Sequence, residues 1–151
     1  MLSNPIELVT MVSRIANAEM QVEPTLLSNK RKKFKRLNIN QNHLNYVKKA
    51  MSNVVNSEQG TAYKSKLNKF NVKMAGKTGT VQVVRISEEE REKGIIKNKD
   101  REWKKRDHAL FVGYAPIEKP QYSICVIVEH GGSGSATAAP IARDIMEKLL
   151  V

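Results

Sequence analysis

Two runs of β-branched and aromatic residues, joined by a short linker, constrain the fold of this chain more than any other feature. The runs are HALFVGYA, from His108 to Ala115, and QYSICVIVE, from Gln121 to Glu129. Residues of these types favour strands. The linker PIEKP contains two prolines, which suit a tight connection. The sequence therefore predicts two neighbouring antiparallel strands.

The N-terminal segment has the signals of a helix start. Asn4 can act as the N-cap, Pro5 fits the first helical position, and Glu7 follows the cap by three residues. An apolar stripe at helical spacing follows, formed by Leu8, Val9, Val12, Ile15 and Ala16. We expect a helix over residues 4–17.

Two further helices are predicted from the same spacing. The first begins near Asn40 and ends before the turn residues 56–60. Its expected buried side consists of Leu44, Val47, Met51 and Val54. The second follows the glycine loop at 130–135, with Pro140 in its first turn. Its expected apolar stripe consists of Ile141, Ile145 and Leu149, with Met146 and Leu150 beside them.

The glycine loop HGGSGS matches neither of the common phosphate-binding glycine motifs. We expect it to be a turn with positive φ angles that returns the last helix to the sheet. The GTA segment at residues 60–62 likewise indicates only a tight turn after a helix.

A third strand is expected within residues 73–84, KMAGKTGTVQVV. The order helix, helix, strand, strand, strand, helix then predicts an α+β fold with an antiparallel sheet and flanking helices. At 17.0 kDa, residues 1–151 are long enough for one domain with a core. Residues 86–107 are highly charged and form an expected insertion, in which Ser87 could cap a short helix.

The third strand carries the strongest candidate site. Gly76 and Gly79 weaken a strand and usually mark the close approach of another backbone or a ligand. Lys77 can attract a carboxylate, and the hydroxyls of Thr78 and Thr80 can hydrogen-bond it. This combination suits an extended peptide-like substrate with a terminal carboxylate. A chance Lys-Thr-Gly-Thr on a surface strand is the alternative.

The formal net charge of +11 raises a second possible function. Basic runs at Lys30–Arg36 and Lys97–Arg106 could follow phosphates, and Phe34 or Trp103 could stack on bases. Runs of like charge are more often solvated loops, so nucleic acid is not expected as a partner. A basic module for nucleic acid or another anionic polymer remains the alternative function.

Other chemistry finds little support. Cys125 lies in an apolar run, which favours packing over reactivity, and a single cysteine excludes an intrachain disulfide. His43, His108 and His130 are far apart in the sequence, so neither a metal site nor a cofactor is expected. No apolar run approaches the ~20 residues that span a bilayer, and the N-terminus has no signal-peptide pattern. We expect no membrane anchor in this sequence.

Five segments, in order, resemble one known family. These are NPIELVTMVSRIAN, VVNSEQGTAYKS, KMAGKTGTVQV, HALFVGYAP and VIVEHGGSGSATAAPIARDIMEKLL. Together they resemble the C-terminal part of the transpeptidase domain of class B penicillin-binding proteins, close to penicillin-binding protein 2. K-T-G is one of three signatures of penicillin-binding proteins and serine β-lactamases. One departure is Asn4, which stands in the family's threonine position.

The resemblance implies a partial β-lactamase/transpeptidase-like fold and a peptidoglycan D,D-transpeptidase. Its partners would be D-Ala-D-Ala stem peptides and β-lactams, on the periplasmic side of the bacterial inner membrane. By position, Lys77 would supply positive charge near the substrate carboxylate. Thr78 and Thr80 would bind that carboxylate, and Gly79 would let the substrate lie against the strand. The N–H of Thr80 would form half of the oxyanion hole, so Lys77 and Thr80 are the catalytic candidates.

Two family signatures are missing from these 151 residues. No serine is followed three residues later by lysine, so the nucleophile motif S-x-x-K is absent. No serine or tyrosine has asparagine two residues on, so S-x-N is also absent. We therefore expect a substrate-binding part of the domain that needs an upstream half, or the full-length enzyme, for activity. A truncation, a split gene or a degraded gene would each produce it. A small independent enzyme with an unrecognised catalytic group is a third possibility.

Overall fold

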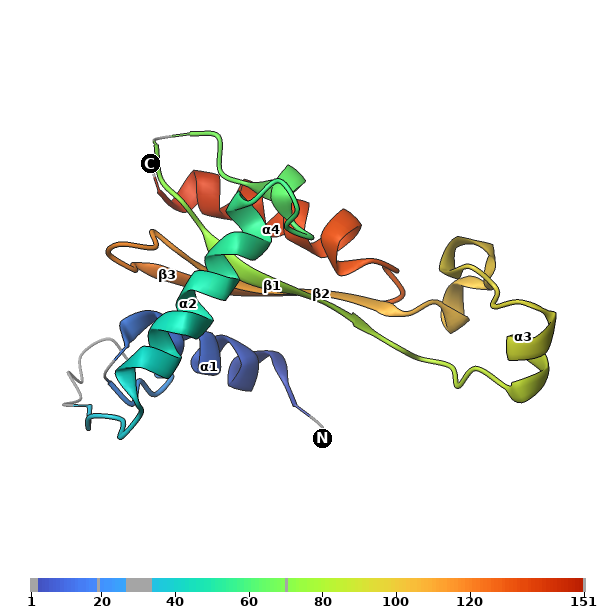
Figure 1. Cartoon of the computed structure of the whole chain (residues 1–151), viewed down its shortest axis with the longest axis horizontal. Helices are drawn as coiled ribbons and strands as arrows, with labels where there is room; N and C mark the ends of the chain where they lie inside the picture. Colours follow the sequence, from blue (N-terminus) through green and yellow to red (C-terminus); the bar gives the residue numbers. More distant parts are fainter. Residues whose placement is uncertain (1–2, 19, 27–33, 70, 151) are drawn as a thin grey trace.

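The computed structural model describes residues 3–18, 20–26, 34–69 and 71–150. In this part of the chain, one antiparallel sheet has the strand order β1 (Ala75–Val81), β2 (His108–Ala115), β3 (Tyr122–Val128). Helix α4 (Ala139–Leu149) packs on one face and α1 (Pro5–Asn17) on the other, while α2 (Gln41–Asn56) contacts β1 (Figure 1). The predicted α+β fold, with an antiparallel sheet and flanking helices, is confirmed.

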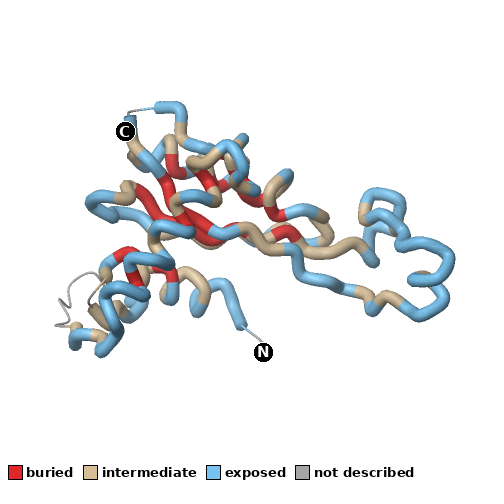
Figure 2. The backbone as a smooth tube through the Cα atoms, viewed as in Figure 1, coloured by how far each residue is buried: buried red, intermediate tan, exposed pale blue. Residues whose placement is uncertain are grey.

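The core is divided into two clusters by the sheet. Alternate side chains of a strand point to opposite faces, so β2 contributes to both clusters. Phe111 packs with Met74 and Met146 on the α4 side, and Tyr114 packs with Val12 on the α1 side. All five side chains are fully buried. Figure 2 shows the buried segments concentrated in the sheet and in the helices beside it.

Helix α1 begins as its sequence predicts. The Asn4 side chain accepts a hydrogen bond from the Glu7 N–H (2.9 Å), and the Glu7 carboxylate accepts one from the Asn4 N–H (3.0 Å). This reciprocal arrangement satisfies backbone donors that have no partner within the helix. The chain leaves the helix at Ala18, which adopts a positive φ of 68°.

The buried side predicted for α2 is partly wrong. Leu44 and Met51 are buried, but Val47 is 40% exposed and Val54 is only half-buried. Val55 is fully buried instead. The C-terminal part of α2 packs against the cluster on the α4 side, so Val55 is buried there. Val47 instead lines a hollow between α1 and α2.

The apolar stripe predicted for α4 is also wrong. Ile141, Ile145 and Leu149 are each at least 40% exposed, and the buried face is formed by Ala139, Ala142 and Met146. Both stripes have helical spacing, and alanines let the helix axis approach the sheet closely. Met146 and Leu150 were correctly predicted to lie on the apolar side. Met146 is buried in the cluster, and Leu150 is half-buried against it.

Residues 82–107, called the arm below, connect β1 to β2 and project away from the sheet (Figure 1). Figure 2 shows the arm as largely exposed. It contains α3 (Glu88–Lys93), whose N-cap is Ser87, as predicted. Glu90 pairs with Arg101, and an Asn98–Asp107 contact closes the base of the arm. Among the helices of the described residues, none is long and apolar enough to cross a membrane.

Candidate functional site

The four candidate residues lie in the middle of β1, at an edge of the sheet. Strand β1 pairs with β2 on one side, and in the described chain no further strand pairs with its other side. Lys77 and Thr80 are exposed, and Thr78 and Gly79 are half-buried. The motif is therefore accessible along the outer edge of the sheet.

The candidate side chains divide between two faces of the sheet. Lys77 pairs with Val112 of β2 and lies on the face that carries α1, whereas Thr78 pairs with Phe111 on the α4 face. Thr80 shares the face of Thr78. A ligand at the strand edge can be contacted from both faces.

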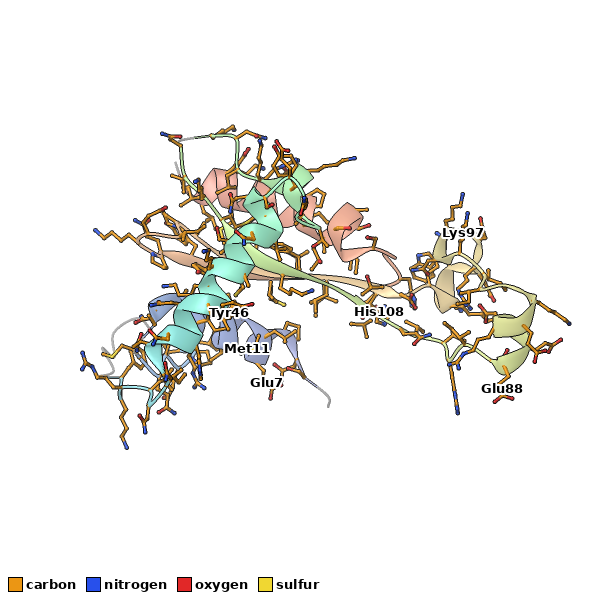
Figure 3. The ribbon with its side chains drawn as sticks, viewed as in Figure 1. Glu7, Met11, Tyr46, Glu88, Lys97 and His108 are labelled. Atoms are coloured by element: carbon orange, nitrogen blue, oxygen red, sulfur yellow. The ribbon has the colours of Figure 1, made fainter. Side chains whose placement is uncertain are left out.

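Lys77 borders an apolar hollow of about 430 Å³. Its other lining residues come from α1, α2 and β2, and include Met11, Ile15, Tyr46 and Val112. Figure 3 labels Met11 and Tyr46, which lie near each other on neighbouring helices. The Lys77 ammonium itself folds back and donates a hydrogen bond to the Thr78 carbonyl oxygen (2.5 Å). The lysine is thus held at the boundary between the hollow and the strand.

Thr78 has a hydroxyl partner that sequence reasoning missed. The Oγ1 atoms of Thr61 and Thr78 are 3.0 Å apart. Residues 60–62 form a tight turn after α2, as predicted, and this turn brings Thr61 beside β1. The contact joins residues 17 apart in sequence, so only the fold reveals it.

Gly79 is packed against the glycine loop. A Cβ built on Gly134 would lie 2.3 Å from the Gly79 carbonyl oxygen and 2.9 Å from the Gly79 nitrogen. The loop also has positive φ at His130 (55°) and Gly132 (80°), so the predicted turn is present. Its support of β1 was not predicted. Gly76 has a different role, because a Cβ there would lie 2.2 Å from the Phe111 ring.

Two of the histidines come together although they are distant in sequence. The His130 N–H donates to His108 Nδ1 (2.9 Å), and the Trp103 ring lies 4.6 Å from the His130 ring, centroid to centroid. Within the described residues, no three His, Cys, Asp or Glu side chains gather in a way that could hold a metal ion. Cys125 packs against the α1-side cluster, and burial raises the pKa of its thiol.

Two cations of the basic runs, Arg101 and Arg106, are engaged in contacts within the arm. Residues 30–33 of the first run lie outside the described residues. In the second, Arg101 pairs with Glu90, and Arg106 donates to the carbonyl oxygens of Lys99 and Arg101. These cations stabilise the arm internally. The structure does not favour the anionic-polymer alternative.

Comparison with known proteins agrees with the resemblance seen in the motifs. The family model of the penicillin binding protein transpeptidase domain matches residues 1–147. The chain belongs to this family. It corresponds to the C-terminal transpeptidase part of proteins like penicillin-binding protein 2 (PBP2).

Individual relatives point to the same proteins. The chain is 40% identical over 103 residues to the peptidoglycan D,D-transpeptidase MrdA of Haemophilus influenzae, covering 68% of this chain and 15% of that protein. It is similar to Helicobacter pylori PBP2, solved in complex with MreC, with TM-score 0.79, 30% identity and coverage of 98% and 25%. Pseudomonas aeruginosa PBP2 in complex with WCK 5153 gives TM-score 0.69, 29% identity and coverage of 100% and 30%. The chain therefore spans only a small part of the length of these relatives.

Proposed function

We propose that this chain forms the substrate-binding wall of a peptidoglycan D,D-transpeptidase. The observation that carries the proposal is the Lys77-Thr78-Gly79-Thr80 motif on an accessible sheet edge, in a chain that matches the transpeptidase family over residues 1–147. The substrate is a stem peptide ending in D-Ala-D-Ala, and β-lactams occupy the same edge. The protein acts on the periplasmic side of the bacterial inner membrane.

Each motif residue has a role that its position allows. Lys77 places positive charge beside the substrate carboxylate and the reacting serine, and the hydroxyls of Thr78 and Thr80 donate to that carboxylate. Gly79 leaves room for the substrate backbone. The Thr80 N–H stabilises the developing oxyanion, a contribution whose loss typically costs ~10² to 10³ in rate.

The acyl transfer needs a serine that this sequence does not identify. The serine oxygen attacks the carbonyl carbon of the penultimate D-Ala, the terminal D-Ala leaves as the amine, and an acceptor amine then takes the acyl group. We assign this serine, with the S-x-x-K and S-x-N motifs, to an upstream part of the transpeptidase domain. By this proposal, residues 1–151 alone are inactive.

Exposed apolar surfaces support a missing upstream part. The hollow beside Lys77 is lined by side chains of α1 and α2 that include Met11 and Tyr46, which are 47% and 76% exposed. On the opposite side of the molecule, α4 exposes Ile141 and Ile145. Apolar surface of this kind is normally covered in a folded domain. An upstream part that covers the hollow would lie beside Lys77 of β1.

The test is acylation by a labelled penicillin, followed by intact mass. The two samples are this chain alone and a hybrid polypeptide in which the full chain replaces the corresponding C-terminal part of the transpeptidase domain of Haemophilus influenzae MrdA. We expect no adduct on the chain alone and one adduct per hybrid molecule, on a serine upstream of the chain. An adduct on the chain alone, or a folded hybrid that is not acylated, would contradict the proposal.

A further inference from the structure

Thr61 is a further hydroxyl at the candidate site, outside the K-T-G signature and within the GTA segment at residues 60–62. Its Oγ1 lies 3.0 Å from the Thr78 Oγ1, within hydrogen-bond distance. Either oxygen can be the donor of this bond. The direction of this hydrogen bond determines whether the Thr78 hydroxyl can donate its proton to a ligand.

The backbone around Thr61 is firmly held. The Ala62 N–H donates to the Val54 carbonyl oxygen (2.9 Å), and the Tyr63 N–H donates to the Gly60 carbonyl oxygen (3.1 Å). A Cβ built on Gly60 would lie 2.4 Å from the Val54 oxygen, so the turn sits directly against the end of α2. Thr61 is therefore presented to β1 from a fixed turn.

The same end of α2 is tied to β1. The Asn56 side-chain amide donates to the Met74 carbonyl oxygen (2.9 Å), at the residue before the strand begins. The end of α2 therefore contacts both the turn that carries Thr61 and the start of β1. The short side chains of Thr61 and Thr78 can therefore meet without a long side chain reaching across.

A hydroxyl carries one proton and can accept two hydrogen bonds. If Thr78 donated its proton to Thr61, it would have none left for a carboxylate. If Thr61 donates instead, the Thr78 proton is free to point outward, and the two bonds strengthen each other. An anionic ligand selects the second arrangement, because a carboxylate only accepts.

We propose that Thr61 is a positioning residue for the substrate carboxylate, acting through the hydroxyl of Thr78. Thr61 donates to Thr78, and Thr78 donates to the carboxylate. This inference rests on the proposed function of β1. Thr61 should therefore affect the reaction only of ligands that carry a free carboxylate. It should not affect ligands in which the carboxylate is masked.

The test compares a penicillin with its methyl ester on the hybrid transpeptidase. The second-order rate constant of acylation is measured by intact mass for wild type, Thr61→Val and Thr61→Ser. Thr61→Val keeps the shape of the side chain and removes the hydroxyl. Thr10→Val is the matched control, because the Thr10 hydroxyl bonds only to the Ile6 carbonyl oxygen of its own helix among the contacts described.

We expect Thr61→Val to slow acylation by the penicillin about tenfold. The loss of a hydrogen bond to a charged group, or of one that orients its donor, typically has an effect of about this size. With the methyl ester, Thr61→Val should be acylated at the same rate as wild type. Thr61→Ser and Thr10→Val should match wild type with both compounds. An unchanged penicillin rate in Thr61→Val would overturn the inference. So would equal losses with penicillin and ester, which would indicate a general structural role. The wild-type rate tests the proposed function separately.

Discussion

Strand β1 and the arm are continuous in sequence, but they are held in place in different ways. The backbone of β1 is contacted at close range by separate segments, with Gly134 against Gly79 and the Phe111 ring against Gly76. The arm is held mainly by its own polar contacts, such as the Glu90–Arg101 pair. A single added methyl group is therefore expected to disturb β1 far more than the arm.

The largest effect should come from Gly134→Ala. Its new methyl group would lie 2.3 Å from the Gly79 oxygen and 2.4 Å from the Leu110 oxygen, so the strand or the loop has to move. We expect the free energy of unfolding to fall by about 3 kcal/mol. Acylation of the hybrid by penicillin should slow ~10²-fold, because small displacements of positioned groups cost this much.

Gly94→Ala is the matched change in the arm. A Cβ on Gly94 meets nothing within 4 Å, but its φ of 104° is strained for alanine. We expect a loss of about 1 kcal/mol in the arm and an unchanged acylation rate. Chemical denaturation and acylation kinetics on both variants check the comparison. Equal acylation rates for Gly134→Ala and Gly94→Ala would refute the tight support of β1.

A smaller effect is expected when the arm's own contact is weakened. Glu90 and Arg101 are 14% and 12% exposed, and Glu90 also accepts a hydrogen bond from the Ile96 N–H. Glu90→Gln removes the charge and leaves Arg101 without its counter-ion, at a cost of about 2 kcal/mol. Hydrogen exchange should speed up in residues 88–106, with β1 protection unchanged. Faster exchange in β1 as well would mean that the arm and strand form one cooperative unit.

The sequence predicted the local signals of this fold well and its packing less well. The cap at Asn4, the cap at Ser87 and the strand pair around PIEKP depend on neighbouring residues, and all are present. The buried stripe of α4 was wrong because two stripes have the same period. Apolarity favours the isoleucines, whereas close approach to the sheet favours Ala139 and Ala142.

The candidate site divides in the same way. The residue types of β1 and the order of the family motifs could be read from the sequence. The hydroxyl contact of Thr61 and the support of Gly79 by Gly134 could not, because each joins residues from different elements. Gly134 was interpreted only as part of a turn, and nothing in its neighbours indicates what it touches.

The most direct measurement is the acylation rate of the hybrid after loss of the Lys77 charge. Lys77→Ala should slow acylation by penicillin ~10²-fold, because a paired charge in a partly desolvated site typically contributes a few kcal/mol. Lys73→Ala, which removes an exposed lysine shortly before the same strand, should leave the rate unchanged. This result would support the assignment of β1 as the substrate-binding wall. Equal rates for the two variants would contradict the assignment of β1 as the substrate-binding wall.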